Sequence, residues 1–201
     1  MKARIFIDFW NFQLTLNNVA SSNYRVDWKK LAPWLIHQTS EILGTPLSYE
    51  GANIYLSYDP GGAKDIKLRD FAVNVLDRLP GIQVTLKERK ARNAPTCPTC
   101  HQLIKFCPHC NSPMNRLIEK GVDTAMVTDL LKLAWENAWE IAIVISSDRD
   151  FIPAIELLDA KGYRVINAHF PPNGMHLARA CWASIDLRSG LPNLRWNPSE
   201  K

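Results

Sequence analysis

Residues 141–151, IAIVISSDRDF, join an apolar run to an abrupt polar break, and this junction decides the fold. The first five residues are apolar and mostly β-branched, which is typical of a strand buried on both faces of a parallel sheet. A turn rich in serine and aspartate follows, and apolar residues then recur at helical spacing from Phe151 onward. A strand, a polar turn and a helix in this order predict part of a β-α-β unit.

The same alternation of strand-like and helix-like segments runs along most of the chain. Strand-like apolar runs cover residues 3–8, 52–58, 82–87, 140–146 and 163–168. Amphipathic stretches cover residues 27–43, 64–79, 124–137 and 150–161. This pattern predicts an α/β fold of Rossmann-like layout, with a mainly parallel central sheet flanked by helices. A chain of 201 residues that is 46% hydrophobic can bury one such core.

One segment, residues 93–115, departs from this alternation because it is rich in Cys, Pro and Asn. We expect a small insertion in a domain that spans residues 1–190, followed by a polar C-terminal tail at 191–201. Two C-x-x-C pairs lie six residues apart in the insertion, and this spacing predicts a zinc ribbon with a structural Zn²⁺ held by Cys97, Cys100, Cys107 and Cys110. His101 and His109 are competing ligands, and a redox dithiol is the alternative reading.

Positive charge concentrates in the middle of the chain. Residues 64–120 contain 11 Lys and Arg against 5 Asp and Glu, whereas the formal net charge of the whole chain is +4. A polyanion is a natural partner for such a surface, although a solvated surface is the simpler explanation. The candidate nucleic-acid contacts around the insertion are Lys87, Arg89, Lys90, Arg92, Lys105 and Arg116.

Carboxylates stand where the predicted strands end. Asp8 ends the first strand, Asp148 and Asp150 follow the fourth, and Asp123 starts a helix. Because ligands of open parallel sheets bind beyond the carboxyl ends of the strands, we expect these acids to meet at one edge and to hold Mg²⁺ or Mn²⁺. The alternative is helix capping by Asp123 and Asp148, with Asp150 as a first-turn acid. Asp8 has a capping role only if a helix begins at Phe9.

Three segments, IFIDFWN, KGVDTAMVTDLL and VISSDRDFIPAIELLDAKGYRV, together resemble the NYN domains, a PIN-like nuclease group, and particularly its LabA-like branch. The resemblance implies a PIN-like Rossmannoid sheet and a metal-dependent ribonuclease site. Its catalytic metal ligands would be Asp8, Asp123, Asp148 and Asp150. Supporting or substrate-contacting residues would be Asn11, Ser146, Ser147, Asp129 and Lys120. The family's usual Ser-Gly-Asp is Ser146-Ser147-Asp148 in this chain.

The expected function is therefore endonucleolytic hydrolysis of single-stranded RNA with Mg²⁺ or Mn²⁺ as the catalytic cofactor. A non-catalytic RNA-binding or regulatory protein of the same fold and a DNA-directed nuclease remain alternatives. We expect no membrane association, since no window has the ~18 apolar residues of a spanning helix. Paired cysteines and the lack of a signal-peptide pattern favour the cytoplasm. The resemblance leaves a homodimer open.

Overall fold

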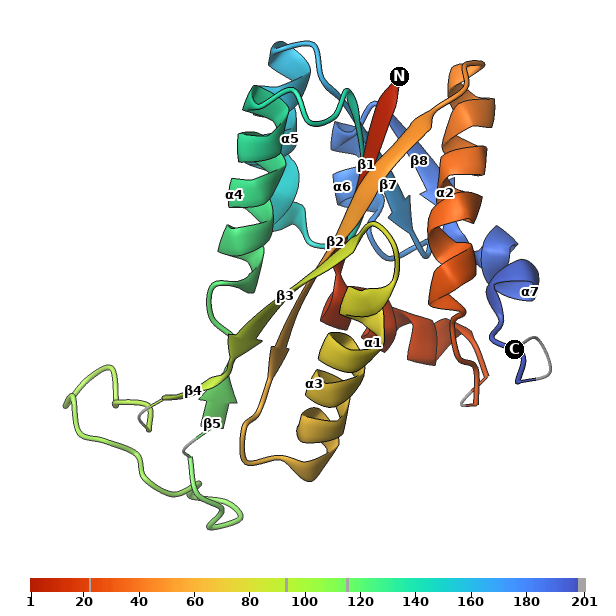
Figure 1. The fold of residues 1–201 in the computed structure, drawn as a ribbon. Coiled ribbons are helices and arrows are strands. Elements are labelled where there is room, and N and C mark those ends of the chain that lie inside the picture. The colour runs from red at the N-terminus through yellow and green to blue at the C-terminus, as the bar shows by residue number, and fades with distance from the viewer. Residues whose placement is uncertain (22, 93, 115, 199–201) are drawn as a thin grey trace.

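The computed structural model describes residues 1–21, 23–92, 94–114 and 116–198. Its centre is a six-stranded sheet in the order β3-β2-β1-β6-β7-β8, in which all neighbouring strands run parallel (Figure 1). The strands are β1 (Lys2–Asp8), β2 (Ser48–Tyr58), β3 (Ile82–Glu88), β6 (Ile141–Ile145), β7 (Arg164–His169) and β8 (Ala183–Asp186). The predicted α/β fold with a mainly parallel sheet is confirmed.

Helices cover both faces of this sheet and make it the middle of three layers. One face packs against α1 (Phe9–Val19), α2 (Trp28–Leu43), α3 (Ala63–Asn74), the 3₁₀ turn η1 (Leu76–Arg78) and α7 (Leu191–Leu194). The other face packs against α4 (Val122–Trp135), α5 (Ile152–Ala160) and α6 (Met175–Ala180). Side chains alternate between the faces along each strand, so Ile5 and Ile7 lie in one core and Phe6 in the other.

The strand order places a topological switch point between β1 and β6. From β1 the chain moves outward to β2 and β3 on one side, and β6, β7 and β8 fill the other side. Ile7 pairs with Ile145 across the two central strands, so Asp8 and Ser146 follow at the same level. Open α/β sheets bind ligands at such a switch point.

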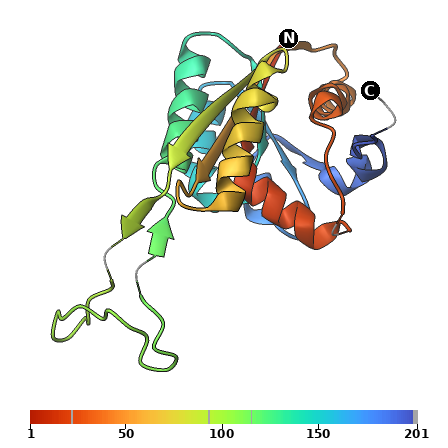
Figure 2. The ribbon, with the colours of Figure 1, turned by 60° about the horizontal axis from the view of Figure 1, so that its bottom comes forward.

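The insertion leaves the body of the domain through a short antiparallel ribbon. Its strands are β4 (Lys90–Arg92) and β5 (Arg116–Ile118), and they project from the end of β3 beyond the sheet (Figures 1 and 2). Residues 93 and 115, the expected limits of the insertion, lie outside the described residues, as do the side chains of Arg92 and Arg116.

Some elements go beyond the sequence-based expectation. We expected neither α1, α6 nor β8, and β2 begins at Ser48, four residues before the predicted run. The start of the expected tail also packs on the fold, since Leu194 of α7 is buried in the core. The remaining short turns are η2 (Arg149–Phe151) and η3 (Leu187–Gly190). In the described part of the chain, no helix combines the length and apolarity that crossing a membrane requires.

Candidate active site

Asp8 lies at the switch point and is held from two sides. Strand β1 ends at Asp8 and α1 begins at Phe9, so the carboxylate caps the helix and its Oδ1 accepts a hydrogen bond from the Asn11 amide at 3.2 Å. Its Oδ2 accepts a hydrogen bond from the Ser146 hydroxyl at 3.2 Å. The side chain is only 6% exposed. We expected Asp8 to cap a helix only if that helix began at Phe9, and α1 does begin there.

The loop after β6 is organised by side chains from both central strands. Asn11 Oδ1 accepts a hydrogen bond from the Ser147 amide at 2.8 Å, and the Ser146 hydroxyl accepts one from the Asp148 amide at 3.1 Å. Asp148 caps η2 by accepting a hydrogen bond from the Asp150 amide at 2.9 Å. Ser147 does not adopt a left-handed φ. A serine side chain therefore fits at this position of the loop without backbone strain.

Asp123 reaches the same edge from the start of α4. The capping residue of α4 is Gly121, at φ 80°, so the capping role considered for Asp123 is wrong, and Asp123 lies in the first turn of the helix. Gly121 favours this junction because a residue without Cβ enters the left-handed region readily. Desolvation raises the pKa of Asp123, and the negative charges of Asp148, Glu119 and Asp150 raise it further.

The buried carboxylate of Asp8 responds to the same charges. Burial raises its pKa from 3.8 to about 7, and the nearby charges of Asp123 and Glu119 add to the rise. The hydrogen bonds from Asn11 and Ser146 act in the opposite direction, because they stabilise the charged form. Acids from β1, α4 and the loop after β6 are thus close enough to repel one another.

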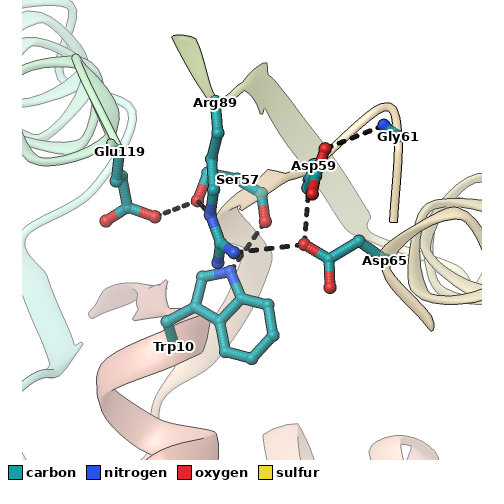
Figure 3. Close-up of polar contacts among 7 residues, drawn as sticks. All are labelled: Trp10, Ser57, Asp59, Gly61, Asp65, Arg89 and Glu119. Carbon is teal, nitrogen blue, oxygen red and sulfur yellow. Dashed lines mark hydrogen bonds and ion pairs between the residues drawn. The ribbon is translucent and has the colours of Figure 1, made fainter. Parts of the chain in front are cut away.

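Glu119 belongs to this acidic cluster, although nothing in the sequence singled it out. It follows β5 directly, and its carboxylate accepts a hydrogen bond from the hydroxyl of buried Ser57 on β2 (Figure 3). Its place depends on the ribbon that returns the chain from the insertion to the sheet. No local motif signals such a return, so sequence reasoning missed it.

Comparisons with known proteins bear on the family and the fold of the chain. The NYN domain family matches residues 2–188. The chain belongs to the NYN domain family. The crystal structure of a protein of unknown function from Vibrio parahaemolyticus is similar, with a TM-score of 0.55, 15% identity and 92% of each chain covered. A likeness at this identity supports the fold alone. No curated protein sequence matches the chain. NYN domains are PIN-like nucleases, which makes this chain a nuclease-type domain by family.

Asp129 and Lys120, two predicted supporting residues of the NYN domain, are not part of the acidic cluster. Asp129 Oδ2, on α4, accepts a hydrogen bond from the hydroxyl of buried Tyr55 at 2.9 Å. That contact and the surrounding burial raise the pKa of Tyr55. Asp129 is not among the charges that raise the pKa of Asp8 or Asp123. Lys120 is exposed next to Gly121, near the start of α4.

Among the predicted nucleic-acid contacts, Arg89 is the most constrained. Its Nη1 pairs with Asp65 at 3.1 Å, its Nε donates to the Ser57 hydroxyl at 3.1 Å, and its guanidinium lies 4.8 Å from the Trp10 ring centroid (Figure 3). Arg89 therefore links the base of the insertion to α1, β2 and α3. By contrast, Lys87, Lys90 and Lys105 are exposed. RNA contact by any of these residues stays a prediction.

The two cysteine pairs of the insertion form turns of the same design. The Cys97 amide donates to Gln102 O and the His101 amide donates to Cys97 O. In the second pair, the Cys107 amide donates to Ser112 O and the Asn111 amide donates to Cys107 O. The residue after each pair has a positive φ, which is 57° at His101 and 55° at Asn111.

Hydrogen bonds also favour the charged form of two of these thiols. Amides of Cys100 and Thr99 lower the pKa of Cys97, and a hydrogen bond with Ser112 lowers that of Cys110. A lowered pKa suits a metal ligand, since the thiolate is the binding form. Two such pairs could supply the four ligands of a tetrahedral thiolate site, which stays a prediction.

Neither metal site is preassembled as a tight cluster. Across residues 1–21, 23–92, 94–114 and 116–198, no group of three or more His, Cys, Asp or Glu side chains is arranged to hold one ion. The donors nevertheless fit the expected ions. Carboxylates that raise one another's pKa at a sheet edge suit a hard divalent cation, and paired thiols with lowered pKa suit zinc.

Proposed function

We propose that this NYN domain is a metal-dependent endoribonuclease that hydrolyses phosphodiester bonds of single-stranded RNA. The observation that carries the proposal is the approach of Asp8, Asp123 and Asp148 at the switch point. Burial, with the charges of Asp123 and Glu119, raises the pKa of Asp8 to about 7, and burial with the charge of Asp148 raises the pKa of Asp123. Keeping several carboxylates together costs stability unless a cation neutralises them. A fold that retains such a cluster at its ligand edge is suited to metal-assisted hydrolysis.

Mg²⁺ or Mn²⁺ would be held by Asp8, Asp123, Asp148 and Asp150, with Glu119 close by. When bound, such a cation supplies Lewis-acid polarisation of the phosphodiester and lowers the pKa of an attacking water. The chain's own contribution is positioning. The hydrogen bonds of Asn11 and Ser146 fix Asp8 and the loop after β6 in one arrangement, so the acids need little reordering when substrate binds.

The insertion would complete the substrate site. We propose that Cys97, Cys100, Cys107 and Cys110 bind one structural Zn²⁺, which closes the two turns on each other and supplies the stabilisation that so small a segment lacks. Lys87, Lys90 and Lys105 would then hold the RNA backbone beside the acids, and binding would weaken steeply with salt. The three motifs favour the LabA-like branch within the family, and a cytoplasmic setting would keep the thiols reduced.

Cleavage of labelled single-stranded RNA and DNA with Mn²⁺ tests the proposal. We expect the wild-type chain to cut RNA in preference to DNA. Asp148→Asn should abolish cutting and retain RNA binding, whereas Asp159→Asn, a matched change at an exposed position of α5, should leave cutting unchanged. RNA binding without cutting under any divalent metal would favour the regulatory alternative. Equal or faster cutting of DNA would favour the DNA-directed nuclease.

A further inference from the structure

A groove of about 780 Å³ lies between α1, α3 and the C-terminal segment, and the two residues that follow Asp8, Phe9 and Trp10, line it. Its walls are rich in aromatic and aliphatic side chains, including Phe9, Trp10, Trp28, Phe71, Val75 and Trp196. Phe71 and Trp196 are 36% and 43% exposed, so their rings remain accessible to a ligand. A volume of this size is typical of ligand-binding sites.

Trp10 connects the wall of the groove to the acidic cluster through hydrogen bonds. Trp10 lies in the first turn of α1, two residues after Asp8, and its Nε1 donates to Ser57 O at 2.7 Å. The Ser57 hydroxyl donates in turn to Glu119 of the acidic cluster, while Asp65 of the groove wall pairs with Arg89 (Figure 3). Trp10 and Ser57 thus link the groove wall to Glu119 of the acidic cluster.

The far wall of the groove is held in place by the C-terminal segment. The Asp27 amide donates to Leu194 O at 2.8 Å, Val26 pairs with Arg195 in an antiparallel bridge, and the Trp196 amide donates to Arg25 O at 2.8 Å. These backbone contacts fix the position of Trp196 while its indole stays accessible. A fixed ring loses little entropy when it stacks on a ligand.

The charges along the groove favour an anionic ligand. Its two acids already have partners, since Asp27 caps α2 and Asp65 pairs with Arg89. Arg25, Lys29 and Lys64 also line the groove, and within the described part of the chain no ion pair involves them. Aromatic rings interleaved with cations match the bases and phosphates of a single strand.

We propose that this groove binds the bases of single-stranded RNA next to the cleaved linkage, with Phe71 and Trp196 as stacking platforms. The proposal rests on the proposed function for the identity of the cleaved strand. An unpaired strand is required, because the bases of a duplex are stacked on one another and cannot lie on protein rings. The groove thereby selects single strands, while the acids act on whichever phosphate it presents.

Fluorescence anisotropy of a labelled single-stranded RNA of about 12 nucleotides tests the proposal, with the full chain carrying Asp148→Asn in Mn²⁺ buffer. Added to this background, Phe71→Ala and Trp196→Ala should each weaken binding roughly 5- to 150-fold. Trp135→Ala, a matched change of an exposed ring at the end of α4, should have no effect. An abasic backbone of equal length should bind all four proteins alike, because it offers phosphates without bases.

The outcomes separate this proposal from the proposed function. Unchanged RNA affinity in both groove variants would overturn the groove proposal, even if the wild-type chain cuts RNA. Weakened RNA binding in these variants would support it, even if no metal promotes cutting. A groove that serves a peptide or a second copy of the chain would show altered sedimentation in the variants with unaltered RNA affinity, and this result would also overturn the proposal.

Discussion

Replacing Asp8 by Asn should stabilise the metal-free protein and do so increasingly as pH rises. The folded pKa of Asp8 is about 7, against 3.8 for an unperturbed aspartate. Because the folded protein favours the protonated form of Asp8, this residue does not destabilise the fold below pH 3.8. The free energy of unfolding then falls as the pH rises from 3.8 toward 7. Asn cannot ionise, yet it can still cap α1 and share a hydrogen bond with Ser146.

The size of the effect follows from the pKa difference. At 1.36 kcal/mol per pKa unit, the raised pKa of Asp8 costs about 4 kcal/mol at pH 8, where the folded carboxylate is ionised, and about 2 kcal/mol at pH 5, where the group must take up a proton on folding. The advantage of Asp8→Asn should therefore grow by about 2 to 3 kcal/mol between these pH values. For a chain of this length, that corresponds to a Tm difference that widens by about 5 to 10 °C.

Thermal unfolding in EDTA at both pH values measures this difference, with Asp159→Asn as the control that should track the wild type. Adding Mn²⁺ at pH 8 should raise the Tm of the wild type and much less that of Asp8→Asn, because only the native carboxylate binds the ion. An Asp8→Asn Tm that falls below the wild-type value at pH 8, or a gap that does not widen with pH, would refute the reasoning.

Three further predictions concern the insertion and its junction with the domain. A double Cys97→Ser, Cys107→Ser variant should lose one Zn²⁺ per chain by elemental analysis while the main unfolding transition is retained; unchanged zinc content would exclude the thiolate site. Arg89→Lys should lower the free energy of unfolding in urea by about 1 to 3 kcal/mol, since a lysine cannot bond Ser57 and Asp65 while stacking on an indole; no change would show that these bonds are dispensable. Gly121→Ala should lower the free energy of unfolding by about 1 kcal/mol in the same assay, because the φ of 80° is unfavourable for alanine. The added Cβ meets no atom within 4 Å, so backbone strain is the only cost; an equally stable variant would contradict this.

How far the sequence predicts the fold depends on how local the signal is. The predicted apolar runs in β1, β2, β6 and β7 became strands that are buried on both faces of the sheet, and β3 became a partly buried edge strand. Strand β8 was missed because Ile185 is the only buried residue among its four. Helix α1 was missed because it begins directly after β1, with no turn residues to mark the boundary.

In the candidate site too, only the residues with a local sequence signal could be predicted. Asp8 and Asp148 could be predicted because acids beyond parallel strands share an edge whenever the strands are neighbours. Glu119 could not, because its position depends on how the ribbon β4-β5 returns to Ser57. The contacts of Arg89 with Trp10 and Asp65 likewise join segments far apart in the chain, and periodicity carries no information about such meetings.

The ribbon β4-β5 brings the two ends of the cysteine-containing segment together, so this segment could be replaced without disturbing the sheet. Arg92 pairs with Arg116, so the two ends of the intervening segment are neighbours. A hairpin turn of a few residues can close the ribbon in place of that segment, and a different module can be grafted there without changing the order of the strands. A different segment at this junction would thus leave Asp8, Asp123 and Asp148 in place, because they lie on β1, on α4 and in the loop after β6.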